Sequence, residues 1–415
     1  MAAMATSAFS QGSTVSPYSQ YGFGELAPQG VGVNRAMNGL GIALQRGNQV
    51  NPINPASYAS VDSLTMLFDM GVSGQITSFN ENGVKLNART ANVDYVVGAF
   101  RAWRNVGITF GLLPYSNIGY DYHSTQTLSA MQTTVTTNNF GDGGLHQLFI
   151  GAGFRPVKPV AIGFNFSYLW GGFDKFVDTS SSSTINSLMK NYTADVDNFS
   201  LDLGLQVYIP LGKEDQLTLG ATYGLGHKLK ADAACLLIST NSSIAKADTT
   251  KTIVKNALEL PHTFGAGVSF SHGQQLVIGA DAQMQRWGKT QFPTYADGEY
   301  TLRSGLLKNS YRLTVGGEYC PLWNGRRFFQ RVRYRFGAGY TTPYYKINGQ
   351  DGPRQYSASI GFGIPIMNGY NNRSVLNVSA QWVNSAATGL IKENSFRLNI
   401  GLTFNEKWFA KWRVE

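Results

Sequence analysis

The residues that could do nucleophilic or acid–base chemistry are few and poorly spaced for it. The 415-residue chain holds five histidines and two cysteines. A hydrolase needs a nucleophile beside a base, and no G-x-S-x-G segment occurs near a histidine. Cys235 and Cys320 lack the spacing of a metal site or a disulfide framework. We therefore expect no catalytic residue, no metal, no cofactor and no enzymatic activity. The histidines fall in expected loops or near strand ends: His123, His146, His227, His262 and His272.

Charged residues as a group are scarce. Lys and Arg number 34 and Asp and Glu 25, or 14% of the chain, against roughly 25% in an average soluble domain. An aromatic content of 13% argues against disorder. No apolar run of about 18 residues exists, which argues against membrane helices. The net charge of +9 comes without a Lys/Arg-rich block, so we expect no nucleic-acid partner.

The charges that do occur alternate with apolar residues along predicted strands. In residues 395–404, Phe396, Leu398 and Ile400 alternate with Arg397 and Asn399. A charge facing lipid at mid-depth costs roughly 2–4 kcal/mol, so the polar face must point into a barrel. These lumen charges either form a salt-bridged filler network or select a ligand, and both interpretations stay open. The residues predicted to line the lumen are Asp69, Asp94, Asp202, Asp281, Arg312, Glu318, Arg331, Arg333, Arg335 and Arg397.

The elements that position these residues are strands of about 9–14 residues. Strands of a β-sandwich are nearer 5–6 residues, so the length favours a transmembrane barrel. The fold prediction is an all-β, antiparallel barrel of about 14 strands that crosses the bacterial outer membrane many times, in contact with outer-membrane lipid and lipopolysaccharide. The strands are predicted at 64–78, 90–102, 106–118, 144–155, 160–174, 195–209, 216–231, 257–271, 275–287, 309–320, 329–342, 354–366, 374–384 and 395–405. Long Ser/Thr/Asn-rich extracellular loops are predicted at 119–143, 175–194, 232–256 and 288–308.

Large apolar residues on the outer face are expected to meet lipid or form interfacial belts. They are Met66, Phe68, Met70, Trp103, Trp170, Trp287, Trp323 and Trp382. Four regions follow: 1–12 as the end of a signal peptide, 13–62 as an N-terminal hatch, 63–405 as the barrel, and 406–415 as a periplasmic aromatic and basic tail. A plain extension of the last strand is the alternative for the tail.

The N-terminal region carries the most specific sequence signal. Gly30, Gly32, Arg35 and Gly39 form a glycine-rich stretch, and Asn54-Pro55-Ala56 follows just before the first strand. This pattern resembles the hatch of the FadL/TodX family of outer-membrane transport proteins, in particular the branch found in Bacteroidota. Glycines allow tight folding in a crowded lumen, and prolines rigidify a segment that must stop short of the sheet. Weaker similarity continues to residues 401–409.

The resemblance implies a transport mechanism. A hydrophobic small molecule, fatty-acid-like or aromatic, would be captured by loops 119–143, 175–194 or 232–256, pass the hatch, and leave sideways at a kinked third strand. Pro114 cannot donate to the sheet ladder. Gly111, Pro114, Tyr115 and Ser116 are therefore the expected kink and lateral opening, with a simple bulge as the alternative. We expect Arg35 to hold the hatch through Asp69 or Asp94.

A second function keeps the fold without transport. Barrels related to this family in Bacteroidota serve as subunits of outer-membrane secretion or barrel-assembly complexes, and PorV-like proteins share the Asn-Pro-Ala signature. The expected partners are accordingly either a hydrophobic small molecule or other outer-membrane complex subunits.

Overall fold

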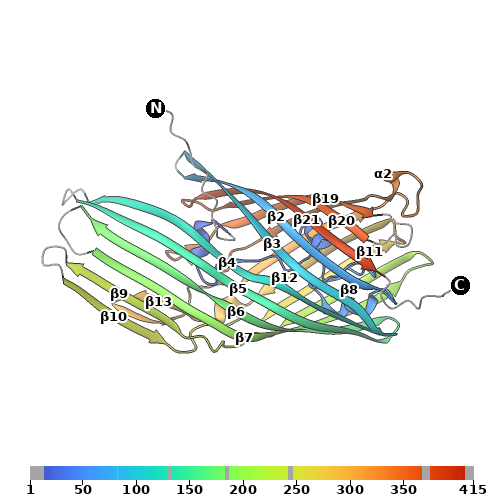
Figure 1. Ribbon diagram of the computed structural model, residues 1–415, viewed down its shortest axis with the longest axis horizontal. Coiled ribbons are helices and arrows are strands. Elements are labelled where there is room, and N and C mark those ends of the chain that lie inside the picture. Colours follow the sequence, from blue (N-terminus) through green and yellow to red (C-terminus); the bar gives the residue numbers. More distant parts are fainter. Residues whose placement is uncertain are drawn as a thin grey trace.

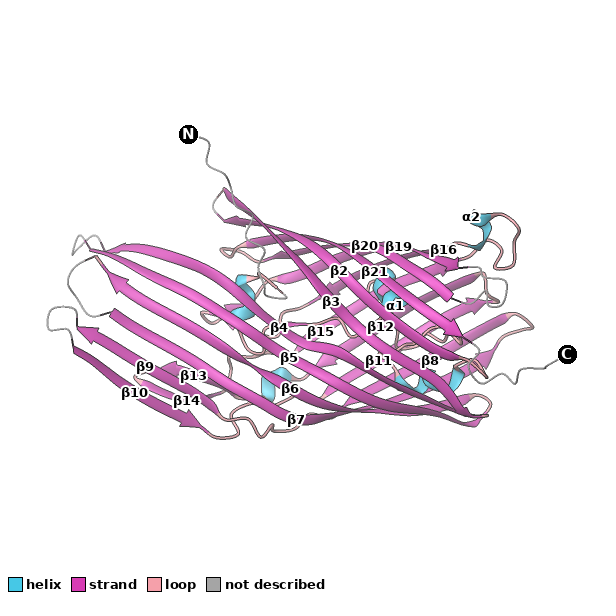
Figure 2. Ribbon diagram, viewed as in Figure 1, coloured by secondary structure: helices cyan, strands magenta, loops and turns pink. Residues whose placement is uncertain are grey.

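Fourteen long strands close into one antiparallel barrel (Figures 1 and 2). The computed structural model describes residues 14–81, 83–128, 133–182, 187–241, 246–366 and 374–406. Sequential barrel strands pair with each other, and β2 pairs with β21, so that Gly71 lies opposite Gly401 and the barrel closes. The barrel strands are β2 (Met66–Glu81), β3 (Val84–Trp103), β4 (Val106–Leu128), β5 (Thr133–Val157), β6 (Val160–Ser181), β7 (Ser187–Pro210), β8 (Asp215–Gly224), β11 (Thr263–His272), β12 (Leu276–Gln285), β15 (Ser310–Tyr319), β16 (Arg333–Thr341), β19 (Arg354–Ile366), β20 (Ser374–Ala386) and β21 (Lys392–Glu406). The predicted fold class is confirmed.

The two faces of the strands differ in the way the alternation predicts. On β21, Phe396 and Ile400 are exposed on the outer surface, whereas Asn399 and Thr403 are buried inside. Among the described residues, no helix is long and apolar enough to cross a membrane. A closed barrel with an apolar outer face and a polar interior is an outer-membrane barrel, which places the chain in the bacterial outer membrane.

The barrel wall is much taller on one side. β4, β5, β6 and β7 have 23, 25, 22 and 24 residues, whereas β8, β11, β12 and β15 have 10 each. The exposed apolar residues of β6 run from Ile162 to Tyr168. The strand then rises roughly 40 Å farther along its own axis, to Ser181. In barrels of this kind, the segments that join the membrane-crossing parts of the strands are longer at the extracellular end. The end at which β4–β7 extend beyond the apolar band is therefore the extracellular one. We call β4–β7 beyond the apolar band the tall wall; with β9 and β10 they form the left-hand end of the molecule in Figure 1.

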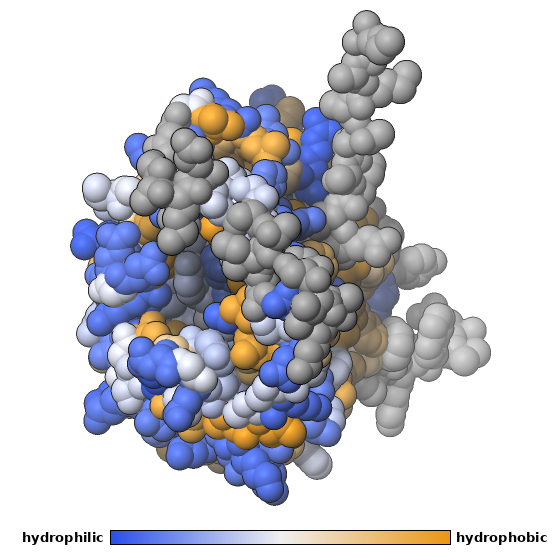
Figure 3. All heavy atoms as spheres, turned by 90° about the vertical axis from the view of Figure 1, so that its left-hand side faces the viewer, coloured by the Kyte–Doolittle hydropathy of each residue, from blue (hydrophilic) through white to orange (hydrophobic). Residues whose placement is uncertain are grey.

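The prediction of long loops at this end is wrong. Residues 119–143 and 175–194 largely extend β4–β7, and residues 232–256 and 288–308 contain the hairpins of β9 (Ala233–Asn241) with β10 (Lys246–Val254) and β13 (Phe292–Ala296) with β14 (Glu299–Arg303). Thr-rich segments favour strands. These segments have no continuous lipid-facing side, so the apolar alternation used for prediction is missing. Viewed from this end, the rim is mainly hydrophilic (Figure 3).

Residues 14–62 lie within the barrel, and we call them the luminal segment. It contains η1 (Pro17–Gln20), β1 (Glu25–Leu26), α1 (Gly32–Ala36) and η2 (Pro55–Ser60). Its side chains form an apolar core with inward-facing residues of the wall, including Tyr95, Val97, Leu113 and Phe149. Outside it, the remaining elements are η3 (Trp287–Lys289), α2 (Phe328–Arg331), β17 (Lys346–Ile347) and β18 (Gln350–Asp351). The expected signal-peptide end and most of the C-terminal tail lie outside the described residues.

Candidate functional site

The barrel ladder is interrupted between β3 and β4. Pairing between these strands runs from Trp103 with Val106 to Val96 with Leu112. Beyond Leu112, β3 stays paired with β2 as far as Val84, while β4 stays paired with β5 and, at Ser116 and Asn117, with β1. Within the described residues, the upper halves of two neighbouring wall strands thus have no ladder pairing with each other.

Two β-bulges flank this gap and give it a local cause. In β3, the register with β2 passes from Tyr95 to Val93, so Asp94 is the extra residue. In β4, the register with β5 passes from Pro114 to Ser116, so Tyr115 is the extra residue. A bulge bends its strand and increases its twist, and Pro114 has no backbone donor. The expected kink at Gly111–Ser116 therefore coincides with a bulge and with the end of the β3–β4 pairing.

The bulge in β3 also redirects side chains. Strict alternation would put Asp94 and Tyr95 on opposite faces. Instead both are buried inside, between the outward-facing Val93 and Val96. Tyr95 lines the candidate site, and alternation alone does not predict this. The sequence signal that identifies Tyr95 is a break in the alternation: Asp94 and Tyr95, which can both form hydrogen bonds, follow each other between Val93 and Val96.

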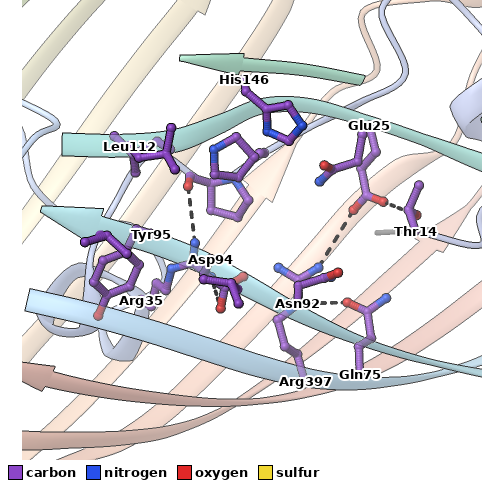
Figure 4. A pocket seen from close by; sticks show the side chains of 17 residues that line it. Thr14, Glu25, Arg35, Gln75, Asn92, Asp94, Tyr95, Leu112, His146 and Arg397 are labelled. Carbon is purple, nitrogen blue, oxygen red and sulfur yellow. Dashed lines mark hydrogen bonds and ion pairs between the residues drawn. The ribbon is translucent and has the colours of Figure 1, made fainter. Parts of the chain in front are cut away.

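A cavity of about 210 Å³ lies at the gap (Figure 4). Val93, Val96 and Leu112 line its outer side and are exposed. Its inner side is polar. There the Arg397 guanidinium donates to Gln75 Oε1 at 2.7 Å and lies 4.0 Å from the Glu25 carboxylate, and Thr14 donates to Glu25 at 2.7 Å. A molecule crossing here would exchange a hydrogen-bonding surface for an apolar one.

Arg35 joins the luminal segment to the edge of this gap. Its guanidinium lies 3.1 Å from the Asp94 carboxylate, and both side chains are nearly fully buried. Of the two expected partners, the structure pairs Arg35 with Asp94. Burial lowers the pKa of the Arg35 guanidinium, and the Asp94 carboxylate opposes this shift. The ion pair therefore offsets part of the cost of burying the Arg35 guanidinium inside the barrel.

The other expected partner, Asp69, acts through Tyr95. The Tyr95 hydroxyl donates to Asp69 Oδ1 at 2.9 Å and accepts from the backbone N–H of Gly32 at 2.8 Å. Thr403 donates to the second Asp69 oxygen at 2.7 Å. The first turn of α1 is thereby connected to β2, β3 and β21. The Tyr95 ring needs the space left by Gly71 and Gly401, because a Cβ at either glycine would overlap it.

A second cavity, of about 260 Å³, lies in the lumen between the luminal segment and β12, β15, β16, β19, β20 and β21. We call it the luminal cavity. It shares Glu25, Arg35, Gln75 and Arg397 with the cavity at the gap. These side chains form a polar partition, so the two cavities are neighbours on either side of it.

The Asn-Pro-Ala motif seats the luminal segment on the wall. The Asn54 side chain accepts from the N–H of Ala56 at 3.1 Å and donates to the carbonyl oxygens of Ile42 and Leu205 at 2.7 and 3.1 Å. Pro55 then begins η2, where proline is tolerated because its missing N–H needs no partner. η2 rests on inward-facing glycines of β4–β7: Gly107, Gly153, Gly163 and Gly204. Of the remaining predicted hatch residues, Gly30 and Gly32 flank and open α1, and Gly39 adopts φ +91°, a value that favours glycine.

This seat predicts a strong effect of Gly153→Val. A Cβ there would lie 2.6 Å from the Ala59 nitrogen and 2.9 Å from Tyr58 Cβ, so η2 must move. We expect the barrel to form but to lose about 1–3 kcal/mol of unfolding free energy, as for other overpacked cores. Urea unfolding in lipid vesicles measures this, and limited proteolysis reports release of the luminal segment. Ala152→Val, on the outer face of the same strand, should change neither; equal effects of both substitutions would contradict the seat.

The remaining predicted lumen residues fall into three groups. Glu318 lies 2.7 Å from both Arg333 and Arg335 and also pairs with Arg46 of the luminal segment. Asp281 accepts from the N–H groups of Gly41 and Ile42 at 2.7 and 2.8 Å. Asp202 and Arg312 also sit at inward positions of their strands.

Two sequence predictions are wrong at the level of single residues. Arg331 does not extend the arginine ladder, because β16 begins only at Arg333 and Arg331 belongs to the helical turn α2. Trp287 is not a belt residue, because it is fully buried. The centroid of its ring lies 5.4 Å from that of Phe23 and 4.9 Å from that of Tyr344. β12 ends at Gln285, and the η3 turn that follows carries Trp287 inward. Trp103, Trp323, Trp382 and Met70 are exposed, as expected.

An aromatic and aliphatic core fills the barrel beside the tall wall. It includes Phe23, Tyr120, Phe173, Trp287 and Tyr344. Lys175 is buried beside it, and its ammonium donates to the carbonyl oxygens of Gln20 and Gly22 at 2.8 and 3.0 Å. No sequence motif singles out Lys175, because residue 175 begins the predicted loop 175–194, directly after the predicted strand 160–174. The predicted capture loops therefore form a packed wall in the described residues.

The fold matches known outer-membrane channels. The Pseudomonas putida toluene transporter TodX has a TM-score of 0.64 at 15% identity, with 93% of this chain and 99% of that chain covered. The Ralstonia pickettii toluene transporter TbuX has a TM-score of 0.61 at 13% identity, covering 91% and 98%. A Pseudomonas aeruginosa FadL homologue has a TM-score of 0.58 at 12% identity, covering 92% and 99%. No curated protein matches the sequence.

These similarities establish a FadL-like outer-membrane barrel, and the structures named here are channels and transporters. The family-level assignment comes from the sequence itself, because the BamG family model matches residues 1–415. The chain therefore belongs to the BamG family.

Proposed function

We propose that the protein passes small hydrophobic molecules, fatty-acid-like or aromatic, from the cell exterior through its lumen and out sideways between β3 and β4. The observation that carries this proposal is the end of the β3–β4 ladder at Val96 and Leu112, with a cavity directly at that point. A continuous β3–β4 ladder would seal the wall. Backbone groups left unpaired in lipid are costly, so barrel strands pair with their neighbours where they cross the membrane, and the end of this ladder marks an opening. The toluene transporters TodX and TbuX share the fold and support this direction.

The luminal segment is the proposed hatch. Gly30, Gly32, Arg35 and Gly39 fold it, and the Asn54-Pro55-Ala56 motif anchors it on the tall wall. Arg35 with Asp94 and Arg397 with Gln75 form the polar partition that a solute has to pass. Capture of the solute would begin at the rim of the tall wall and not in flexible loops.

A second candidate function is that of a subunit in an outer-membrane secretion or assembly complex. The tall wall favours it, because strands that continue well beyond the apolar band of β6 offer a large rigid surface outside the membrane. The packed aromatic core beside that wall also leaves little room for a capture pocket there. The match to the BamG family is compatible with this role.

One experiment separates the two functions. A phospholipid bilayer already passes hydrophobic solutes, so the assay uses cells whose outer leaflet is lipopolysaccharide. We expect expression of the protein to raise the initial rate of N-phenyl-naphthylamine uptake at least threefold over cells with an empty vector. Mild extraction and native mass spectrometry then report bound partners. No increase in uptake, together with stoichiometric partner subunits, would reject transport and support the second function.

A further inference from the structure

We propose that the luminal cavity is a binding site for a small hydrophilic oxyanion, a carboxylate or phosphate on a hydroxyl- or amide-bearing body, with Arg312 as its anchor. The inference goes beyond the proposed passage of hydrophobic molecules and does not depend on it. Its anchor lies on the β12–β15–β16–β19 part of the wall, and the cavity extends from there to the polar partition beside the β3–β4 gap.

The first step is the charge balance of the cavity. Five of its six charged groups have partners: Arg35 with Asp94, Arg397 with Gln75 and Glu25, Asp281 with backbone N–H groups of the luminal segment, and Glu393 with the Ser16 hydroxyl at 2.7 Å. The sixth is Arg312. Among the described residues, no carboxylate lies within ion-pair distance of its guanidinium and no side chain or carbonyl accepts from it.

The second step is where Arg312 points. Its strand neighbours Tyr311 and Leu313 are exposed on the outer surface of the barrel, so Arg312 is on the inward face. Its side chain is nevertheless accessible, and the space it faces is the luminal cavity. A guanidinium presents five N–H donors in a planar fork that suits carboxylate or phosphate. An enclosed, unpaired guanidinium thus favours an anionic ligand.

The third step is the body of the ligand. Gln283 and Thr341 lie directly opposite Arg312 on the two neighbouring strands. Thr314, Gln355 and Ser357 continue the same lining. These are neutral hydrogen-bonding groups, to which an alkyl chain would offer no hydrogen bond. Ser357 differs from the others in that it already bonds to Asn38 and to the Gly339 carbonyl. A ligand with hydroxyl or amide groups would satisfy them. The volume of about 260 Å³ suits a molecule of monosaccharide size.

The test uses the full-length protein in nanodiscs of zwitterionic lipid, titrated calorimetrically with glucuronate. We expect glucuronate to bind at least tenfold more tightly than glucose, which lacks the anion, and than acetate, which lacks the body. Arg312→Gln should weaken glucuronate binding at least tenfold, whereas Arg312→Lys, which keeps the charge, should weaken it less. Arg326→Gln, an exposed arginine between β15 and β16, is the matched control and should bind as the wild type.

Folding is checked by the heat-dependent shift in electrophoretic mobility. If Arg312→Gln does not fold, Thr341→Val takes its place, with an expected weakening of at least threefold. No glucuronate binding at millimolar concentration would overturn the proposal. So would equal affinity for glucuronate and glucose, or wild-type affinity in the folded Arg312→Gln variant. None of these results alters the uptake of hydrophobic probes, so this proposal and the proposed function fail separately.

Discussion

Bridging β3 to β4 across the gap is expected to abolish the uptake of hydrophobic probes. Asn92 on β3 and Asn117 on β4 line the cavity from opposite sides. Replacing both by cysteine, in a Cys235→Ser, Cys320→Ser background, allows a cleavable thiosulfonate cross-linker to join the two strands. We expect the protein-dependent rate of N-phenyl-naphthylamine uptake to fall at least tenfold on cross-linking and to recover on reduction, because the bridge prevents the strands from separating.

The matched control joins two strands whose ladder is continuous. Thr125 and Thr136 lie opposite each other on β4 and β5. A Thr125→Cys, Thr136→Cys pair treated with the same reagent should keep the wild-type rate. Each single cysteine variant shows whether the reagent alone blocks the cavity. An unchanged rate in the cross-linked Asn92–Asn117 pair would reject lateral exit at this gap, whatever the uptake of the unmodified protein.

The barrel itself could be predicted from sequence because the membrane imposes a strict pattern. Where a strand crosses lipid, its outer side chains must be apolar and its inner ones are polar, and this gives a period of two. The predicted strand at 354–366 has the bounds observed for β19, Arg354–Ile366. Beyond the apolar band the constraint disappears. Residues 119–128 and 175–181 continue the strands outside lipid, with Thr and Ser on both faces, so no regular apolar outer face marks them.

Departures from regular strand geometry explain most of the remaining misses. The bulge at Asp94 turns two successive side chains inward, so Tyr95 and its contact with Gly32 escape a rule based on alternation. Trp287 and Arg331 each lie two residues outside the observed strand to which they are assigned by the sequence pattern. A strand end displaced by so little changes which way a side chain points.

Partner choice inside the lumen could not be predicted either. Asp69 and Asp94 were equal candidates for Arg35, since both lie on inward faces close in the sheet. The structure separates them because Tyr95 and Thr403 donate to the two oxygens of Asp69, whereas Ser73 donates to Asp94 Oδ1 and Asp94 Oδ2 lies 3.1 Å from the Arg35 guanidinium. Strand register and bulges determine which carboxylate oxygens remain free for Arg35, and neither can be predicted from the amino-acid composition.

Removal of the Glu318 carboxylate should have the largest effect on stability. This single buried carboxylate holds three guanidinium groups, those of Arg333 and Arg335 on β16 and of Arg46 in the luminal segment. Glu318→Gln leaves these cations uncompensated in a site where Glu318 is 1% exposed and Arg335 fully buried. Breaking a buried pair in this way costs about 3–5 kcal/mol. Urea unfolding in lipid vesicles, followed by tryptophan fluorescence, measures the loss.

Two comparisons assign that loss to uncompensated charge. Asp297→Asn breaks the solvent-exposed pair with Arg303, 2.7 Å apart, and should cost less than about 1 kcal/mol. Adding Arg46→Met to Glu318→Gln removes one of the three cations, so the double variant should be more stable than Glu318→Gln alone. A loss below about 1 kcal/mol for Glu318→Gln, or no recovery in the double variant, would contradict this account. Because Arg46 is the member on the luminal segment, the recovery measures how much of the loss comes from the unpaired charge on that segment.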